Sequence, residues 1–186
     1  MFARTERLTL RPGWIEDAPL LARAAGHEAV IRNTRRMPWP YALGDAEAFL
    51  RTPQTPHTPA LLAFAHESGA VRLVGGVGLS AMDGGGVELG YWITPDAWGC
   101  GYATEAAGAV LAMAAALRIP RVQARHFADN PASGRVLGKL GFRPTGEQSL
   151  GESRARGGPA PVIHYARQLA GHPPLPELED TPPLAA

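Results

Sequence analysis

The sequence predicts an α+β fold in which helices flank one mixed, mostly antiparallel β-sheet. Three apolar, strand-like runs at 60–67, 71–80 and 86–93 follow one another with only short, turn-rich links, which favours adjacent antiparallel strands. The chain then alternates between helical and strand patterns. Its 186 residues are enough to bury a core without metal or disulfide crosslinks. We predict one domain over residues 1–170 and a weakly ordered, proline-rich tail over 171–186.

A short strand and two short helices are predicted ahead of these three runs. Residues 7–11 alternate in polarity and then meet a proline, which indicates a strand. Acidic residues precede an apolar, periodic segment over 16–26, and a glycine ends it, so this segment is predicted to be helical. Prolines and aromatic residues indicate a fixed loop over Met37–Tyr41, followed by a second helix from Asp45 to about Arg51.

The second half is predicted to alternate two helices with two strands. The first helix is rich in alanine and carries apolar residues at helical spacing, so it can lie close against a sheet. The second helix has clear limits, because Asn130 suits the N-cap, Pro131 the first helical position and Gly141 the left-handed C-cap. The predicted elements are helix 101–117, strand 121–127, helix 131–140 and strand 162–169.

Composition excludes several classes of function. The 18 Lys and Arg nearly balance the 17 Asp and Glu, so the net charge of +1 predicts neither nucleic-acid nor membrane-surface binding. The single cysteine excludes an intramolecular disulfide and a multi-cysteine zinc site, and the six histidines lack paired ligand spacing, so no metal is expected. The sequence has no secretory start and no apolar run that could span a bilayer. We expect a soluble, cytoplasmic protein.

The segment WITPDAWGCGYATEA (92–106) predicts an anion site. It joins the end of a strand to the first turn of a helix, where backbone N–H groups lack intrahelical partners and the helix dipole is positive. Glycines at 99 and 101 carry no Cβ that would keep a phosphate away, so phosphate or pyrophosphate is the natural ligand. The segment lacks the Gly-Lys-Ser/Thr ending of a Walker loop, and it has Thr104 where a dinucleotide-binding loop needs Gly or Ala. Neither of these nucleotide-binding loops is therefore expected. The alternative is a tight turn that only starts a helix.

This segment also resembles the phosphate-binding segment of the GCN5-related N-acetyltransferase (GNAT) superfamily, whose signature is Gln or Arg, two residues, Gly, any residue, then Gly or Ala. Trp98 departs from the broad signature, but WGCGYATEA is similar to the form typical of the RimJ/RimL ribosomal-protein N-terminal acetyltransferases. Further motifs occur in the same order: RLTLRP, MPWPY before DAEAFL, VELGYWI and NPASGRVLGKLGF. The resemblance runs from about Arg7 to Gly146.

The resemblance implies an acetyl-coenzyme A-dependent N-acetyltransferase with a GNAT-type sheet whose strands splay at the cofactor site. The acetyl group would move to a primary amine, a protein N-terminus or a small amine, by direct attack in a ternary complex. The pyrophosphate would bind the amides of 99–104, and the pantetheine arm would run beside the strand that ends at Ile93. Trp98 and Tyr102 could instead be core residues. The implied cofactor-binding residues are Ile93, Thr94, Trp98, Gly99, Cys100, Gly101, Tyr102, Ala103, Thr104 and Asn130.

Glu88 and Ser133 are the candidate catalytic residues. Alternation along the strand places Glu88 with Gly90 and Trp92, away from the apolar face. A carboxylate there could take the proton of the amine, directly or through water, or bind the acceptor cation; otherwise it is ordinary surface. The resemblance implies that Ser133 protonates the leaving thiolate, although a serine at this position can also cap the helix. Asn130 can cap the helix and also bind the pantetheine arm.

Trp39, Tyr41 and Glu88 are the predicted acceptor-binding residues, because the aromatic loop would shape that end of the cleft. A nucleophilic role for Cys100 has no histidine motif to support it. Arg135 and Lys139 lie four residues apart on the last predicted helix. The sequence does not decide whether these cations are solvated or contact the cofactor phosphates. The competing function is a coenzyme A-binding regulatory or scaffold module without turnover. A homodimer and transfer of longer acyl chains are further possibilities.

Overall fold

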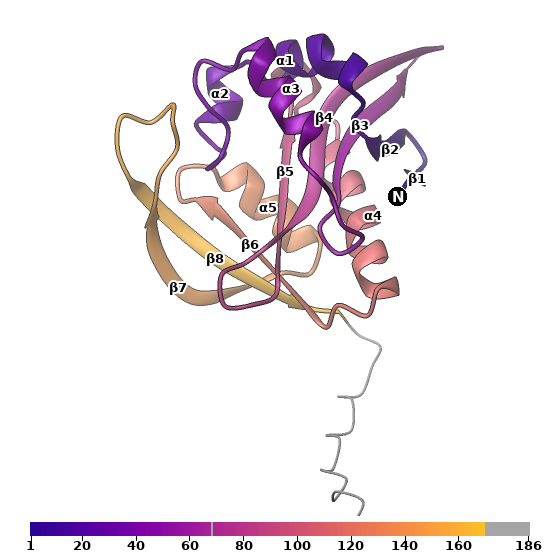
Figure 1. Ribbon diagram of the computed structural model, residues 1–186. Helices are drawn as coiled ribbons and strands as arrows, with labels where there is room; N and C mark the ends of the chain where they lie inside the picture. The colour runs from indigo at the N-terminus through magenta and orange to yellow at the C-terminus, as the bar shows by residue number, and fades with distance from the viewer. Residues whose placement is uncertain (68, 170–186) are drawn as a thin grey trace, which may run out of the picture.

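The computed structural model describes residues 1–67 and 69–169, so the predicted tail over 171–186 lies outside the described residues. Eight strands form one sheet in the order β1-β2-β3-β4-β5-β6-β8-β7, and every neighbouring pair is antiparallel except β5 and β6. Helices flank the sheet (Figure 1). The predicted α+β class and mostly antiparallel sheet are confirmed. No helix among the described residues has the length and apolarity needed to cross a membrane.

The described elements agree with most of the predicted ranges. The strands are β1 (Ala3–Arg4), β2 (Leu8–Pro12), β3 (Ala60–Glu67), β4 (Ala70–Ala81), β5 (Val87–Ile93), β6 (Arg121–Phe127), β7 (Arg143–Gly151) and β8 (Ala160–Gln168). The helices are α1 (Ala18–Ala25), α2 (Glu28–Ile31), α3 (Leu43–Arg51), α4 (Tyr102–Ala116) and α5 (Pro131–Lys139). Three of these, β1, β7 and α2, were not predicted, and short 3-10 turns precede α1 and α4.

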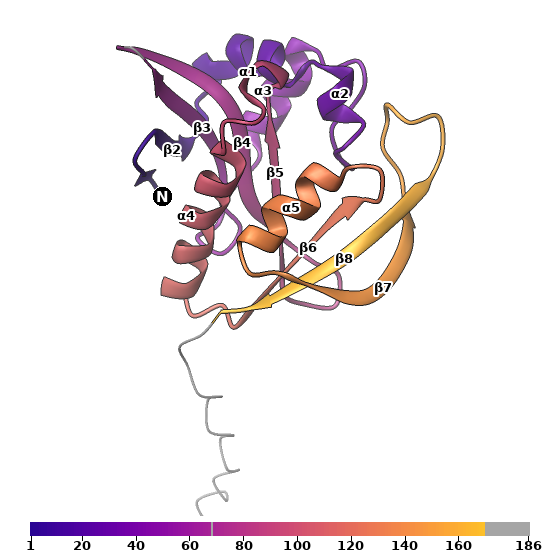
Figure 2. The ribbon, with the colours of Figure 1, turned by 180° about the vertical axis from the view of Figure 1, so that it is seen from behind.

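Each face of the sheet has its own hydrophobic core. The alternation of β3 divides its side chains: Leu61, Ala63 and Ala65 face α4, whereas Leu62 and Phe64 face α1 and α3. Small buried alanines let α4 approach the sheet closely, as the sequence predicted. Figure 2 shows α4 and α5 together on one side, with α1 to α3 gathered at the upper end of the molecule.

The sheet splits between its two parallel strands. Only Val87–Leu89 of β5 pair with Val122–Ala124 of β6. Beyond this point β6 leans away from β5 (Figure 1), whereas β4 stays paired with β5 as far as Ile93. Within the described chain, no strand pairs with this edge of β5 from Gly90 onward. The split therefore opens a passage through the sheet and exposes a strand edge to whatever enters it.

Candidate active site

One cleft passes through the split and has a volume of about 850 Å³. On one side it is lined by the N-terminal turn of α4 and by α5, and on the other by the segment between α2 and α3. Most of the predicted site residues meet here. They are Tyr41, Glu88, Ile93, Trp98, Gly99, Gly101, Tyr102, Ala103, Thr104, Asn130 and Ser133.

Three predicted site residues do not line the cleft. Trp39 lies on the surface and is 39% exposed. Thr94 is buried, and its backbone N–H donates to the carbonyl of Val74 at 2.9 Å. Cys100 is exposed, and its carbonyl accepts a hydrogen bond from Arg7. The structure therefore brings together the glycines and the first turn of α4, but not these three side chains.

The N-terminus of α4 carries a run of unpaired backbone donors. The first hydrogen bond of the helix runs from the N–H of Glu105 to the carbonyl of Gly101, at 3.1 Å. The six N–H groups of residues 99–104 donate to no acceptor among the residues described. Gly99 and Gly101 have φ values of +78° and +83°, which only glycine adopts readily. Six free donors at the positive end of a 15-residue helix fit a diphosphate.

Arg7 and Glu105 hold this loop in shape. Glu105 accepts hydrogen bonds from the Thr5 hydroxyl (2.6 Å) and from the backbone and side chain of Arg7 (both 2.8 Å). Arg7 also donates to the carbonyl of Cys100 at 2.9 Å and lies over the Tyr102 ring. The hydrogen bond to Glu105 raises the pKa of Arg7. The turn between β1 and β2 thus fixes the loop before any ligand binds, which limits the entropy lost on binding.

The two aromatic residues of the loop have different roles. Tyr102 is a core residue, 6% exposed, and its hydroxyl donates to Glu67 at 2.5 Å. Trp98 is 52% exposed, and its indole N–H donates to the carbonyl of Ile93 at 2.7 Å. The core alternative therefore holds for Tyr102 and not for Trp98, which ties the turn to the end of β5.

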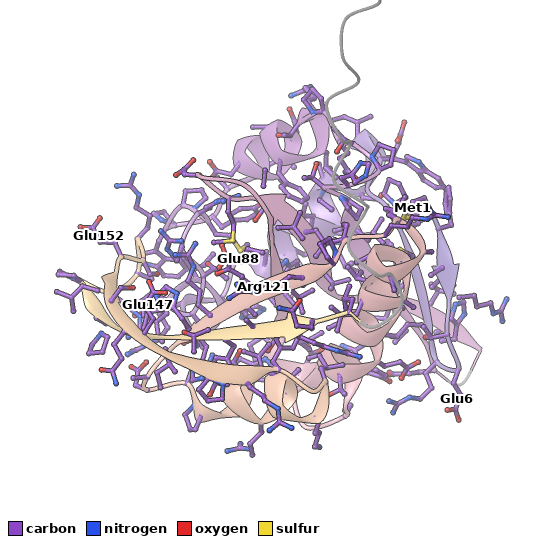
Figure 3. All side chains as sticks on the ribbon, turned by 90° about the horizontal axis from the view of Figure 1, so that it is seen from below. Met1, Glu6, Glu88, Arg121, Glu147 and Glu152 are labelled. Atoms are coloured by element: carbon purple, nitrogen blue, oxygen red, sulfur yellow. The ribbon has the colours of Figure 1, made fainter. Side chains whose placement is uncertain are left out.

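Glu88 is bound to an arginine that sequence reasoning missed. Both oxygens of its carboxylate accept hydrogen bonds from Arg125, at 2.5 and 2.6 Å, and both side chains are largely buried. Val87 and Leu89 pack in the core on the α4 side, so Glu88 faces the opposite side of the sheet, as predicted. Seen from below, Glu88 lies in the middle of the molecule, whereas Glu6, Glu147 and Glu152 lie at its outline (Figure 3).

Ser133 is hydrogen-bonded to a tyrosine of β5. Its hydroxyl lies 2.8 Å from the hydroxyl of Tyr91, which also donates to the Ser133 carbonyl at 3.1 Å. Burial raises the pKa of Tyr91 to about 12, so this phenol keeps its proton at ordinary pH. The Asn130 side chain accepts from the Ser133 N–H at 3.3 Å, which is the predicted cap. Helix α5 and Tyr91 together hold the serine at the cleft.

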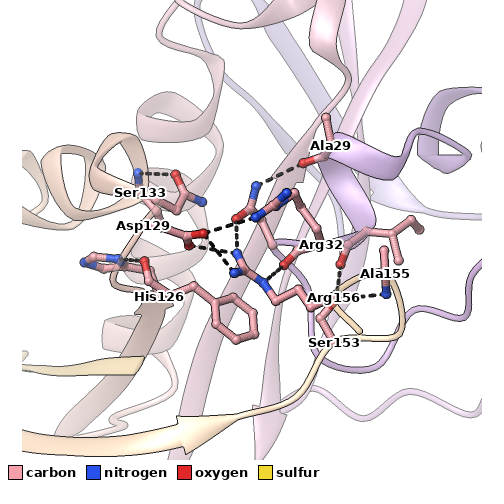
Figure 4. A network of polar contacts seen from close by, with 12 residues as sticks. Ala29, Arg32, His126, Asp129, Ser133, Ser153, Ala155 and Arg156 are labelled. Carbon is pink, nitrogen blue, oxygen red and sulfur yellow. Dashed lines mark hydrogen bonds and ion pairs between the residues drawn. The ribbon is translucent and has the colours of Figure 1, made fainter. Parts of the chain in front are cut away.

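A polar network anchors the segment that lines the other side of the cleft (Figure 4). Arg156, in the loop between β7 and β8, donates to both oxygens of Asp129 at 2.8 and 2.9 Å and to the carbonyl of Arg32. These hydrogen bonds lower the pKa of Asp129. The buried hydroxyl of Ser153 donates to the carbonyl of Ile31 at 2.8 Å. The end of α2 is thereby fixed to the β6–α5 turn and to the β7–β8 hairpin.

Residues 7–143, most of the chain, match the acetyltransferase (GNAT) domain family. The chain belongs to this family. A relative from Bacillus subtilis (strain 168), the uncharacterized N-acetyltransferase YoaA, is 37% identical over 78 residues. That match covers 40% of this chain and spans 44% of the relative's length.

Solved structures of GNAT proteins have the same fold. An acetyltransferase of the GNAT family from Bacillus anthracis superimposes with a TM-score of 0.74 at 21% identity, covering 90% of this chain and 98% of that one. A putative acetyltransferase from Salmonella typhimurium, yncA with its cofactor acetyl-CoA, gives 0.69 at 21% identity, covering 89% and 96%. RimL, a ribosomal L7/L12 alpha-N-protein acetyltransferase in complex with coenzyme A, gives 0.75 at 18% identity, covering 91% and 98%.

Membership of the GNAT family makes the chain an acetyltransferase and confirms the predicted cosubstrate, acetyl-coenzyme A. The residues present fit this molecule on two independent observations. The amides of residues 99–104 offer donors for a diphosphate, and the unpaired edge of β5 offers main-chain groups to an amide-bearing arm. Similarity to RimL at 18% identity shows the fold alone, so it does not assign the chain to the RimJ/RimL subgroup.

Proposed function

We propose that this GNAT acetyltransferase moves the acetyl group to a primary amine by direct attack in a ternary complex. The observation that carries the proposal is the cleft, which has six unpaired amides at its α4 end and the Glu88–Arg125 pair on the opposite face of the sheet. A cofactor and an acceptor can then enter from opposite faces and meet in the split. Holding two reactants in this way can account for about 7 to 11 kcal/mol of a reaction barrier.

The backbone groups are proposed to supply most of the cofactor binding. The amides of 99–104 would hold the diphosphate, and the edge of β5 from Gly90 to Ile93 would lie along the pantetheine arm. Asn130 is committed to capping α5 through its side-chain oxygen, which leaves its amide group free to reach the cleft that it lines.

Two side chains are proposed to manage the protons of the reaction. Glu88 would accept the proton lost by the attacking ammonium, directly or through water, or hold that cation in place. Because Arg125 occupies both of its oxygens, we favour the route through water. Ser133 would protonate the departing thiolate, with Tyr91 keeping the serine hydroxyl in position.

The acceptor class is proposed as a primary amine, either a protein N-terminus or a small molecule. The similarity of the fold to RimL supports the first of these, and it also supports a place near the RimJ/RimL subgroup. The apolar residues that line the cleft between β5 and the 29–41 segment support the second, because such surroundings suit a small molecule.

Release of free thiol from acetyl-coenzyme A over a panel of small amines, amino acids and peptides tests the proposal. We expect thiol release that needs an amine, with the acetylated amine found by mass spectrometry. Glu88→Gln should lose activity near neutral pH and recover part of it at high pH, where the free amine is abundant. Glu147→Gln, an exposed carboxylate on β7, is the matched control. Coenzyme A binding without thiol release for any amine would instead indicate the regulatory module.

A further inference from the structure

The cleft carries far more positive than negative charge. Among the described residues, its lining contains five Lys or Arg side chains and one carboxylate, Glu88. Two of the cations, Arg135 and Lys139, belong to α5, on the same side of the sheet as the α4 amides. They lie on the side of the sheet where the cofactor phosphates are proposed to bind. The remaining three, Arg35, Arg36 and Arg125, need another explanation.

These three arginines lie on the acceptor side of the sheet. Val122 and Ala124 pack in the core under α4, so alternation along β6 turns Arg125 toward the opposite face, where Glu88 also lies. Arg35 and Arg36 follow α2, which is anchored on that same face. The diphosphate site at the start of α4 is on the other side of the sheet and does not use them.

Arg35 and Arg36 are the unpaired cations of this group. The charge of Arg125 is balanced by Glu88, whereas neither Arg35 nor Arg36 forms a hydrogen bond or ion pair with any residue of the described chain. Much of the Arg35 side chain is accessible to solvent, but partial burial of its charge lowers its pKa, and the neighbouring Arg125 lowers it further, against a smaller opposing effect of Glu88. A cation that loses hydration in a cleft without a partner is unfavourable, and a bound anion would remove that cost.

The surroundings of Arg35 also suit an apolar group. The acceptor side of the cleft is lined by Leu21, Val30, Met37, Tyr41, Phe49 and Trp92. Between Glu88 and Trp92, the floor of the cleft is Gly90, which is exposed, and a Cβ built on it would meet no atom within 4 Å. There is thus open space for an apolar side chain between the two ends of this strand segment.

We infer that the acceptor is a small apolar amine that bears an anionic group, a carboxylate or a phosphate, close to its amino group. Arg35 would bind the anion through its planar guanidinium, which matches both groups with two parallel hydrogen bonds. The Glu88–Arg125 pair would lie beside the ammonium, with Glu88 attracting it and Arg125 keeping the carboxylate in place. This inference rests on the proposed transfer to a primary amine and narrows its acceptor class.

Binding of matched amines to the protein saturated with coenzyme A is the first test. The probes share one aromatic skeleton: phenylalanine, its phosphonate analogue, phenylalaninamide and 2-phenylethylamine. We expect calorimetry to give dissociation constants at least about tenfold lower for the two anionic probes, as for a charge-assisted hydrogen bond in a partly desolvated site. The neutral amide represents a peptide N-terminus. Equal affinity for the probes with and without an anionic group would overturn the inference. This measurement does not require turnover.

The second test compares Arg35→Gln with Arg23→Gln, which removes the same charge from an exposed position on α1 outside the cleft. For each amine, kcat/KM of the variant is divided by that of the wild type, which cancels the intrinsic reactivity of the amine. Arg35→Gln should lower this ratio about tenfold for phenylalanine and leave it near one for phenylalaninamide. Arg23→Gln should leave both near one. Equal losses on both amines would contradict the role of Arg35, whereas absence of thiol release from every amine would count against the proposed function instead.

Discussion

At the scale of single residues, the site consists of side chains whose hydrogen bonds are already made. Ser133 is an example. Its backbone N–H is capped by Asn130 and its hydroxyl meets Tyr91, so two elements fix its position before any ligand binds. Because burial raises the pKa of Tyr91 to about 12, the phenol keeps its own proton at ordinary pH and remains a hydrogen-bonding partner that orients the serine hydroxyl. The structural and the catalytic interpretations of Ser133 are therefore compatible.

Replacing Ser133 with alanine should lower kcat by about tenfold to a hundredfold, at or below the lower end of the range for a general acid, because a thiolate with an ordinary pKa of about 8.5 leaves tolerably without help. The dissociation constant for acetyl-coenzyme A should stay unchanged by calorimetry. Tyr91→Phe should lower kcat less, since it keeps the serine hydroxyl and removes only its partner. Wild-type turnover in Ser133→Ala would exclude serine as the proton donor.

The sequence could predict which way Glu88 points but not what it binds. Alternation in VELGYWI is visible in one strand, and the structure confirms the predicted face. Arg125 lies on another strand, and its contact with Glu88 depends on the parallel register of β5 with β6, which no local pattern encodes. Arg35 was missed because the segment after α2 is placed by hydrogen bonds to Ser153 and Arg156, which are far away in the sequence. Trp39 was placed with the acceptor from its aromatic character, but the loop turns its side chain to the surface.

At the scale of elements, the start of α4 is the feature on which cofactor binding depends. Gly99 and Gly101 both adopt the left-handed backbone conformation. The amides of the loop stay unpaired because Arg7 and Glu105 hold the surrounding chain in place. The sequence analysis explained these two glycines by the absence of a Cβ that would keep a phosphate away from the amides. The structure adds a second reason, since a side chain at either position would have to adopt an unfavourable backbone conformation.

Gly101→Val should weaken acetyl-coenzyme A binding at least tenfold by calorimetry, because the added side chain disturbs the φ of +83° that presents the amides. Gly84→Val is the control. Gly84 has a similar φ of +85° and lies in the exposed β4–β5 turn, so this variant carries the same backbone cost away from the cleft. If both variants bind the cofactor as tightly as the wild type does, the amides of this loop are not its anchor.

Elements with a strong pattern were predicted, and elements without one were missed. The capping residues of α5 and the alternation of β3 and β5 gave correct ranges. Strand β7 reads RPTGEQSLG and is exposed at every residue but the last, so neither burial nor alternation marks it. It forms only because β8 offers an edge to pair with. Helix α2 is a single turn, too short for any periodicity to appear.

At the scale of the whole molecule, buried and half-buried ion pairs join the elements that surround the cleft. Asp17 accepts two hydrogen bonds from Arg11 and one from the N–H of Trp14, all at 2.7 Å, which ties β2 to the start of α1. Glu105 and Asp129 do the same at α4 and at the β7–β8 hairpin. Burial works against the charged form of Asp17, but the hydrogen bonds outweigh it and its pKa is lowered.

A lowered folded-state pKa means that the unfolded chain binds the proton more readily. The Asp17 contribution to stability is therefore complete above the unfolded pKa of about 3.9 and is lost as the pH falls through the lowered value. Asp17→Asn should reduce the free energy of unfolding by about 3 kcal/mol at pH 7, because it leaves Arg11 without its partner among largely buried groups.

Urea denaturation at pH 7 and at pH 3 measures this contribution. The gap between Asp17→Asn and the wild type should be large at pH 7 and smaller at pH 3, where the unfolded wild-type chain takes up a proton that the folded protein binds only at lower pH. Asp83→Asn, in the exposed β4–β5 turn, should match the wild type at both values. A gap that does not change with pH would mean that Asp17 stabilises the fold through packing and not through its charge. A wild-type midpoint in Asp17→Asn at pH 7 would mean that the acceptor-side helices do not depend on this pair.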